Sequence, residues 1–269
     1  MMYSMLKTPK DRRCAKLEKN ILDETKNYIK ALRLAGIRGD LKERISDAYK
    51  REIAYEELLR DIFRQAYDIR KENSRKRRIK MAKFPYKKYL ADVIVDYLPD
   101  SAKEKFKELK TLNFIDDSRN IIFSGNPGTG KTHLSIGLGL KACNKGYKVF
   151  FATVPQLINT LKETRSEKRL RSFEKKFEKY DLIILDELGY ISFDKEGSEL
   201  LFSFLSLRAE RKSTIITSNL SFDRWNEIFN DPALTAAMVD RLTHKSYVLN
   251  MNGNSFRMKE TKEWLNDND

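Results

Sequence analysis

The sequence predicts an α/β protein with a central parallel sheet, and three observations support this class. Short apolar, β-branched runs alternate with longer helical stretches from residue 120 onward. A glycine-rich loop follows the first run, and a later run ends in two carboxylates. Strands buried on both faces form continuous apolar runs, and the helices between them cover both faces of the sheet. The runs occupy residues 121–123, 148–153, 182–185, 214–217 and, more weakly, 247–251.

Residues 16–80 are predicted to form helices that precede the sheet. Apolar side chains recur there at helical spacing, and Gly36 and Gly39 separate the first two helices. We expect these stripes to pack into a small helical core. The stripes are Leu17, Ile21, Tyr28 and Leu32; Leu41, Ile45 and Ala48; and Leu58, Leu59, Ile62, Phe63, Ala66 and Ile69.

The chain is strongly basic, and its excess charge is unevenly distributed. It contains 53 Lys and Arg against 39 Asp and Glu, a formal net charge of +14. Such an excess implies a polyanionic partner, either nucleic acid or an anionic membrane surface. Residues 1–120 hold 31 basic and 20 acidic side chains, whereas residues 121–269 hold 22 and 19. Polyanion binding is therefore expected mainly in the first part.

A basic run extends from Arg70 to Lys88, where ten Lys and Arg accompany one acid, Glu72. Pro85 is expected to end any helix in this run. A solvated linker helix is one interpretation, and a clamp on the phosphate backbone is the other. The imbalance of charge favours the clamp. The candidate DNA contacts are Arg75, Lys76, Arg77, Arg78, Lys80, Lys83, Lys87 and Lys88.

The composition excludes several classes of protein. A hydrophobic fraction of 41% favours a globular chain over a disordered one. The start of the chain does not resemble a signal peptide, and no run of 18 apolar residues occurs. We therefore expect a soluble, cytoplasmic protein with no membrane segment. Cys14 and Cys143 lack metal-ligand spacing and are expected to be reduced thiols.

The glycine-rich loop has the residue types of a phosphate-binding Walker A motif. Its glycines let backbone N–H groups point at phosphate oxygens, and the following helix adds its positive N-terminal end. Lys131 would contact the β and γ phosphates, and the Thr132 hydroxyl would bind Mg²⁺. The strand–loop–helix context argues against a chance turn, so the loop predicts ATP or GTP binding. Its residues are Gly125, Asn126, Pro127, Gly128, Thr129, Gly130, Lys131 and Thr132.

Two acids, Asp186 and Glu187, follow the apolar run 182–185 about 55 residues after the Walker A lysine. Ligands of open α/β sheets bind at the carboxyl ends of strands, where these side chains would emerge. Asp186 would hold Mg²⁺ through its water shell, and Glu187 would polarise the attacking water. The pattern is a Walker B motif, and Glu187 favours hydrolysis over transfer of phosphate to a metabolite.

Three later residues are candidates for contacts with the γ-phosphate. Asn219 ends the run 214–217 and can bind the phosphate or the attacking water; an Asn that opens a turn is the alternative. Arg241 and Arg257 each carry the permanent charge that stabilises a transferring phosphoryl group. Spacing alone assigns neither arginine, and a surface salt bridge is the alternative for both.

With these motifs in place, the chain resembles the IstB family, the ATPase partners of insertion-sequence transposases. The similarity extends from about residue 20 to about residue 260, and DnaC-type loaders of the replicative helicase belong to the same family. Its most specific parts are Asp186–Tyr190 and Ala82–Pro85. The other matching segments are Asn126–Thr132, Leu182–Leu185, Ser213–Asn219, Asp231–Pro232, Asp240–Leu242 and Arg78–Met81.

The resemblance implies an AAA+ fold that uses ATP and Mg²⁺, preceded by a small basic helical domain. It implies that Asn219 is sensor I, that Arg257 is sensor II, and that Arg241 is an arginine finger acting on a neighbouring subunit. About twenty residues follow Leu249, too few for a full C-terminal lid.

The resemblance also implies extra helices after the second strand, at residues 155–179. Arg169 and Arg171 in this insertion are candidate DNA contacts. Acidic residues partly balance the basic ones there, so a salt-bridged helix pair is an equal alternative.

Together these inferences predict a DNA-binding ATPase that multimerises on DNA and assists a transposase. Residues 1–78 would be a helical partner- and DNA-binding domain, 79–119 a basic linker, and 120–269 the ATPase domain. Duplex DNA would be bound through its phosphates, with weak sequence preference and strong salt dependence. The alternatives are a helicase loader on single-stranded DNA, a nucleotide switch without turnover, and a small-molecule kinase. Glu187 argues against the last two.

Overall fold

The computed structural model describes residues 9–34, 36–37 and 41–266, except for the side chains of 9–19 and 260. The chain divides into two compact units, Met1–Lys76 and Arg77–Asp269.

The first unit is helical, as the sequence predicts. Helix α1 (Pro9–Ala31) is followed by α2 (Leu41–Lys50) and by α3 (Tyr55–Ala82), whose residues 77–82 belong to the second unit. A small core joins them, and it consists of Ile29, Ile37, Leu41, Ile62 and Ala66.

The predicted core stripe of α1 is wrong, and those of α2 and α3 are only partly buried, since Ile45, Leu59 and Phe63 are exposed. Ile21 and Leu32 are 58% and 66% exposed, and Tyr28 is exposed as well. The buried face is shifted by one residue, so that Leu22 and Ile29 point inward instead. Where two apolar residues are adjacent, as at Ile21–Leu22 and Tyr28–Ile29, the spacing fits two neighbouring faces of the helix, and the packing partners decide between them. The side chain of Leu17 and all of Gly39 lie outside the described residues.

The second unit contains the predicted parallel sheet. Its strands follow the order β2-β3-β4-β1-β5, and every neighbouring pair is parallel. The five apolar runs all form strands, so the predicted α/β class is confirmed. The strands are β1 (Ile121–Ser124), β2 (Val149–Thr153), β3 (Leu182–Leu188), β4 (Ser213–Ser218) and β5 (Tyr247–Asn250).

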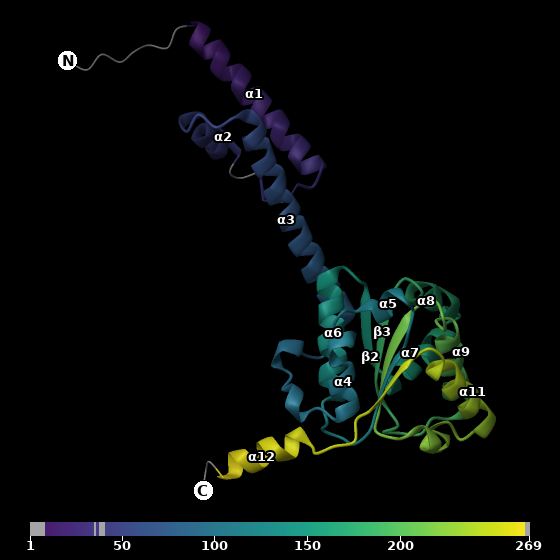
Figure 1. The fold of residues 1–269 in the computed structure, drawn as a ribbon. Helices are drawn as coiled ribbons and strands as arrows, with labels where there is room; N and C mark the ends of the chain where they lie inside the picture. The colour runs from purple at the N-terminus through teal and green to yellow at the C-terminus, as the bar shows by residue number, and fades with distance from the viewer. Residues whose placement is uncertain (1–8, 35, 38–40, 267–269) are drawn as a thin grey trace. The chain divides into compact units, whose positions relative to one another are not determined.

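Helices cover both faces of the sheet and give three layers, as Figure 1 shows. Alternate residues of each strand point to opposite faces, so that Phe123 and Ile184 belong to one core while Ile122 and Ile183 belong to the other. The first core includes α4 (Asp100–Leu109), α5 (Asn113–Asp116) and α6 (Lys131–Lys145). The second includes α7 (Val154–Ser166), α8 (Leu170–Phe177), α9 (Lys195–Ser206), α10 (Asn226–Phe229) and α11 (Pro232–Thr243).

The segment before α4 packs along α6. A Cβ on Gly137 of α6 would lie 2.6 Å from a methyl carbon of Leu90, and one on Gly139 would lie 2.9 Å from the Phe84 ring. Arg78 donates from Nε to the carbonyl of Cys143 (2.8 Å). These contacts attach the segment 77–99, with its short 3₁₀ turns η1 (Leu90–Asp92) and η2 (Val95–Tyr97), to the sheet-containing part of the second unit.

A 3₁₀ turn, η3 (Phe222–Arg224), precedes α10. After β5 the described residues form one further helix, α12 (Phe256–Asn266). Cys143 lies in the α6 core with a free thiol, and burial raises its pKa to about 12. Among the helices that the structure describes, none is both long enough and apolar enough to cross a membrane.

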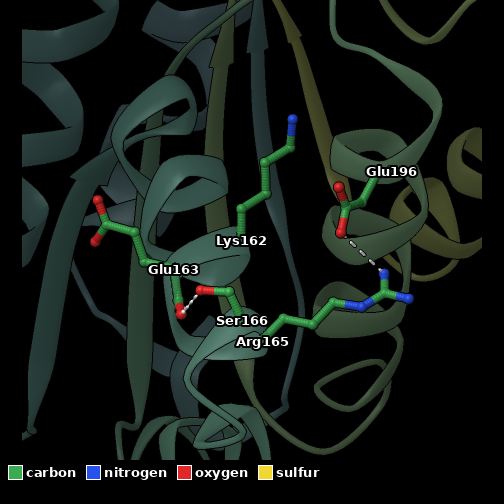
Figure 2. A pocket seen from close by; sticks show the side chains of 5 residues that line it. All are labelled: Lys162, Glu163, Arg165, Ser166 and Glu196. Atoms are coloured by element: carbon green, nitrogen blue, oxygen red, sulfur yellow. Dashed lines mark hydrogen bonds and ion pairs between the residues drawn. The ribbon is translucent and has the colours of Figure 1, made fainter.

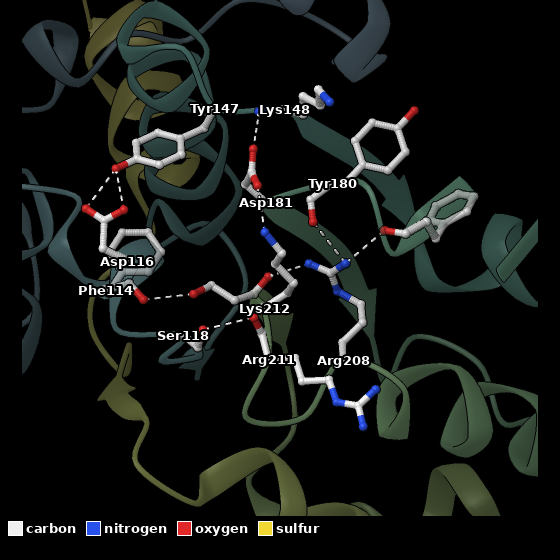
Figure 3. A network of polar contacts seen from close by, with 12 residues as sticks. Phe114, Asp116, Ser118, Tyr147, Lys148, Tyr180, Asp181, Arg208, Arg211 and Lys212 are labelled. Atoms are coloured by element: carbon white, nitrogen blue, oxygen red, sulfur yellow. Dashed lines mark hydrogen bonds and ion pairs between the residues drawn. The ribbon is translucent and has the colours of Figure 1, made fainter. Parts of the chain in front are cut away.

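A buried arginine, Arg208, connects the amino-terminal end of β4 to the end of α8 (Figure 3). The Arg208 guanidinium donates to the carbonyls of Phe177 (3.0 Å), Tyr180 (3.1 Å) and Ser213 (3.0 Å). Burial lowers its pKa to about 10, against the opposing attraction of Asp181. The arginine is 3% exposed, so its donors satisfy carbonyls that water cannot reach.

Candidate nucleotide and catalytic site

The loop between β1 and α6 forms a cradle for phosphate. Gly125, Gly128 and Gly130 have φ angles of +151°, +81° and +90°, which side chains with a Cβ rarely adopt. In the described part of the chain, the backbone N–H groups from Gly128 to Thr132 have no hydrogen-bond partner. Donors of this kind at a helix N-terminus bind anions. The predicted cradle is therefore formed in space.

Lys131 lies buried at the start of α6, 7% exposed. Its Nζ donates to the carbonyls of Gly125 (2.7 Å) and Asn126 (2.6 Å). Burial lowers the pKa of its ammonium to about 8, and the carboxylate of Asp186 partly opposes that shift. A phosphate in the cradle would offer the ammonium the counter-charge that these neutral carbonyls do not supply.

Asp186 lies at the carboxyl end of β3 and is 3% exposed. Its Oδ1 accepts hydrogen bonds from the hydroxyls of Thr132 (3.0 Å) and Thr217 (2.5 Å). Burial raises its pKa, while the hydroxyls and Lys131 lower it. Hard oxygens of a hydroxyl and a carboxylate, adjacent to a phosphate cradle, fit Mg²⁺, which keeps water and phosphate as its other ligands.

Glu187 follows in the left-handed region, with φ +67°. Its backbone N–H donates to the Thr217 hydroxyl (3.0 Å), so Thr217 bonds to both Walker B acids. Partial burial, followed by the charge of Asp186, raises the pKa of the Glu187 carboxyl, and Arg257 lowers it. A raised pKa makes a carboxylate a better proton acceptor.

Asn219 directly follows β4 and reaches the loop after Glu187. With its amide nitrogen turned toward that loop, the side chain donates to the carbonyls of Leu188 (3.2 Å) and Gly189 (3.3 Å). A Cβ on Gly189, whose φ is +106°, would lie 2.6 Å from the Asn219 side chain. The strand order places β4 beside β3, which brings the two predicted motifs together.

The chain after β5 covers the Walker A loop, a contact that the sequence does not predict. The side-chain carbonyl of Asn252 accepts from the N–H of Asn126 (3.1 Å), and the N–H of Phe256 donates to the carbonyl of Gly128 (2.9 Å). A cavity of about 430 Å³ lies beside it, lined by Asp96–Pro99, Gly253–Phe256 and Lys259. Separations of more than a hundred residues leave no local signal for such contacts.

Arg257 and Tyr86 are close enough to the site for electrostatic interactions with its ionisable groups. The charge of Arg257 lowers the pKa of Lys131 and of Glu187. Burial raises the pKa of Tyr86, and the charges of Asp186 and Glu187 add to that rise. Tyr86, from the segment before α4, is a neighbour of the acids that the sequence does not reveal.

Arg241 lies on α11 at the opposite edge of the sheet. The carbonyl of Leu242 accepts from Nδ2 of Asn120 (3.2 Å), which directly precedes β1. The Walker A loop follows the other end of β1, four residues away, a rise on the order of 13 Å. The structure therefore does not bring Arg241 to the Walker A loop of its own chain.

The candidate DNA contacts differ in their surroundings. Arg75 and Lys76 both pair with Glu72, and Arg78 holds the Cys143 carbonyl. The other candidates in this run are exposed, and they are Arg77, Lys80, Lys83, Lys87 and Lys88.

In the inserted helices, Arg169 pairs with Glu167, whereas Arg171 is exposed. Figure 2 shows that Arg165 of α7 pairs with Glu196 of α9 (3.3 Å), near Lys162 and Glu163. Both interpretations of this insertion, DNA contact and salt-bridged helix pair, stay open.

Comparisons with known proteins identify the family. The family profile described as IstB-like ATP binding protein matches residues 27–264. The insertion sequence IS232 protein of Bacillus thuringiensis subsp. berliner, named for ATP binding, is 33% identical over 89% of this chain and 95% of its own. The corresponding IS5376 protein of Geobacillus stearothermophilus is 37% identical over 78% of this chain and 84% of its own.

Solved structures share the fold. AMPPCP-bound DnaA from Aquifex aeolicus superposes with a TM-score of 0.53 at 21% identity, covering 68% of this chain and 56% of that one. DnaI gives a TM-score of 0.53 at 20% identity, covering 66% of this chain and 98% of that one. These likenesses confirm the AAA+ P-loop fold, and the family match covers most of the chain. The chain thus belongs to the family of IstB-like ATP-binding proteins.

Proposed function

We propose that this protein is a Mg²⁺-dependent ATPase that assembles on duplex DNA in the cytoplasm and assists an insertion-sequence transposase. One observation carries the enzymatic part: Thr217 joins Asp186 and Glu187 in a hydrogen-bonded set beside the Walker A loop. A protein that only bound nucleotide would not need a second acid with a raised pKa at that position.

Each residue of the set has a role in hydrolysis. The free N–H groups and Lys131 would hold the phosphates, while Thr132 and Asp186 would hold the metal ion. Bound Mg²⁺ would neutralise charge that develops on the phosphate oxygens. Glu187 would accept a proton from the attacking water, and Asn219 would fix the position of that water. The proton then resides on a Glu187 carboxyl oxygen.

The missing positive charge on the γ-phosphate would come from a second subunit. Arg241 lies at the sheet edge remote from the Walker A loop of its chain, yet an arginine in such ATPases acts only when it touches the transferring phosphate. A neighbour docked with its α11 against the ATP site would supply it. This arrangement couples hydrolysis to assembly.

The DNA part rests on charge and on the relatives. The net charge of +14, together with exposed Arg77, Lys80, Lys83, Lys87 and Lys88, supports binding to phosphates. The names of the two relatives from Bacillus thuringiensis and Geobacillus stearothermophilus assign both proteins to insertion sequences, which are mobile DNA elements. Six or more phosphate contacts would lower affinity on the order of a thousandfold between 50 and 200 mM salt. An affinity independent of salt would contradict this part.

The first experiment is ATP-dependent co-sedimentation with duplex and with single-stranded DNA, using Lys131→Ala as the control. We expect ATP to promote large complexes on the duplex with the native chain only. Preference for single strands would favour a helicase loader instead. Complexes that form equally without ATP, or with Lys131→Ala, would contradict nucleotide control of assembly.

A second experiment isolates hydrolysis from binding. Glu187→Gln keeps the shape and the hydrogen-bonding capacity of the side chain but cannot accept the proton. We expect it to bind ATP and to form complexes on DNA while its single-turnover hydrolysis falls at least a hundredfold, in line with about 10²–10⁴ for acid–base catalysis. Unchanged hydrolysis would remove Glu187 from the mechanism.

A further inference from the structure

The guanidinium of Arg241 has two defined neighbours on α9. Its Cζ lies 4.9 Å from the centroid of the Phe202 ring, and its Nη1 donates to the hydroxyl of Ser206. That hydroxyl donates in turn to the carbonyl of Phe202 (2.6 Å). Because the Ser206 proton is engaged with its own helix, the oxygen presents a lone pair to the arginine. The three residues form one small network at the α9–α11 contact.

These neighbours hold the guanidinium without cancelling its charge. Across the described side chains, Arg241 forms no ion pair with a carboxylate, although Arg165 and Arg224 each pair with a glutamate. The aromatic face and the hydroxyl attract a cation but carry no net charge. A carboxylate in their place would compete with a phosphate for the guanidinium. The alternative of an intramolecular salt bridge, open for Arg241 at the level of sequence, is not found among these residues.

Most of the hydrogen-bonding capacity of the arginine is also kept for a ligand. Within the part of the chain that the structure describes, Ser206 is its one hydrogen-bond acceptor. Guanidinium groups carry five N–H donors, so a phosphate can still receive two of them in parallel. The side chain is thus ordered by contacts that leave its binding edge available.

We propose that Phe202 and Ser206 are positioning residues that pre-orient Arg241 toward the γ-phosphate bound by a neighbouring subunit. This inference rests on the proposed action of Arg241 between subunits. A long arginine side chain loses rotamer entropy when it is ordered, and this loss opposes its docking on a phosphate. Phe202 and Ser206 order the side chain already in the free subunit, so that less entropy is lost when the neighbour docks. The effect belongs to the transition state, so it alters kcat rather than KM.

The test uses the full chain assembled on DNA, with ATP hydrolysis as the readout. Phe202→Leu removes the aromatic face but keeps an apolar side chain, and Ser206→Ala removes the acceptor. Phe222→Leu is the matched control, because Phe222 is also half-buried against the same core and contacts Trp225 instead of Arg241. Phe202→Tyr, which keeps an aromatic face, is the conservative variant.

We expect the double variant Phe202→Leu/Ser206→Ala to lower kcat about tenfold or more with KM changed less than twofold. This loss would be part of the roughly thousandfold loss expected for Arg241→Ala. Phe202→Tyr and Phe222→Leu should retain kcat. In an Arg241→Ala background, the double change should have no further effect, because nothing remains to be positioned. The same fractional loss in both backgrounds would show a merely structural role and overturn the proposal.

Mixed assemblies separate the donor of the arginine from its recipient. Lys131→Ala chains lack a working site but keep Arg241, whereas Arg241→Ala chains keep the site. Mixing the two should restore hydrolysis. Adding Phe202→Leu/Ser206→Ala to the Lys131→Ala chain should reduce the restored activity, and adding it to the Arg241→Ala chain should not. Equal effects from either chain would overturn the proposal.

Two outcomes distinguish the action of Arg241 between subunits from its positioning by Phe202 and Ser206. If Arg241→Ala retains kcat, the action between subunits is wrong and the positioning inference falls with it. If Arg241→Ala loses activity but Phe202→Leu/Ser206→Ala retains it, only the positioning inference is wrong.

Discussion

The hydroxyl of Thr217 donates to Oδ1 of Asp186 over 2.5 Å and accepts the N–H of Glu187 over 3.0 Å. This side chain on β4 therefore fixes the direction of the Asp186 carboxylate on β3, which we propose as a ligand of Mg²⁺. It also fixes the backbone from which the second acid projects. Outer partners of this kind tune the affinity of a site for its metal.

Thr217→Val should lower ATPase activity about 10–100-fold and raise the Mg²⁺ concentration needed for half-maximal rate, because the Asp186 carboxylate loses its orienting donor. Activity as a function of Mg²⁺ concentration is the measurement. Thr214→Val is the control, since Thr214 is equally buried but faces the other side of the same strand. Equal losses in the two variants would indicate damage to β4 rather than to the site.

ATP affinity should weaken as pH rises above about 8, the pKa to which burial lowers Lys131. Below that pH the free ammonium is already charged and binding needs no proton. Above it, binding must take up a proton, so Kd should rise up to about tenfold per pH unit.

Titrating a fluorescent ATP analogue from pH 7 to pH 9.5 measures this profile. Lys131→Arg supplies the control, because a guanidinium stays protonated throughout the range and its profile should be flat. Only the slopes are compared, whatever the absolute affinity of the variant. A flat profile for the native chain would contradict the prediction.

Gly189→Ala should lower kcat, because the new Cβ would lie 2.6 Å from the Asn219 side chain and displace it. Gly146→Ala is a matched control: its φ of +113° is similarly strained, but nothing lies within 4 Å of its Cβ. Both variants should lose about 1 kcal/mol of stability from backbone strain. Only Gly189→Ala should slow hydrolysis, by an estimated tenfold or more if Asn219 orients the attacking water. Steady-state rates measure the loss of kcat, and melting curves measure the loss of stability in each variant. Equal loss of kcat in the two variants would contradict the prediction.

Arg208→Met should lower the free energy of unfolding by about 3 kcal/mol, because it removes the arginine donor from the carbonyls of Tyr180 and Ser213, while Phe177 keeps the N–H of Tyr180. Arg211→Met changes an exposed arginine nearby and should cost less than about 0.5 kcal/mol. Urea unfolding followed by circular dichroism measures both. If the two variants were equally stable, the buried network in Figure 3 would contribute little.

The sequence predicts the strands and the loop between β1 and α6 well for a physical reason. Buried parallel strands require continuous apolar runs, and a phosphate cradle requires glycines at fixed positions. Both requirements are local, so Ile121–Phe123 and Gly125–Thr132 carry them within a few residues.

Long-range packing is what the sequence does not contain. The inward turn of Ile29 rather than Tyr28 depends on the helices packed against α1. The contact of Asn252 with the Walker A loop joins residues 126 positions apart. Thr217 could have been noticed, since it belongs to the strand that leads to Asn219, but a threonine in a strand is ordinary without knowledge of which strand lies beside it.

The place of Arg241, at the sheet edge remote from its own Walker A loop, has an arithmetic consequence under the proposed action between subunits. Each chain contributes its Arg241 to the ATP site of one neighbour, and its own ATP site receives the arginine of the neighbour on the opposite side. An open row of such chains therefore always has one terminal nucleotide without a borrowed arginine, and only a closed ring completes every site. Turnover per chain would rise with the length of the row. The ATP in the terminal site, which lacks a neighbour's arginine, would be hydrolysed last.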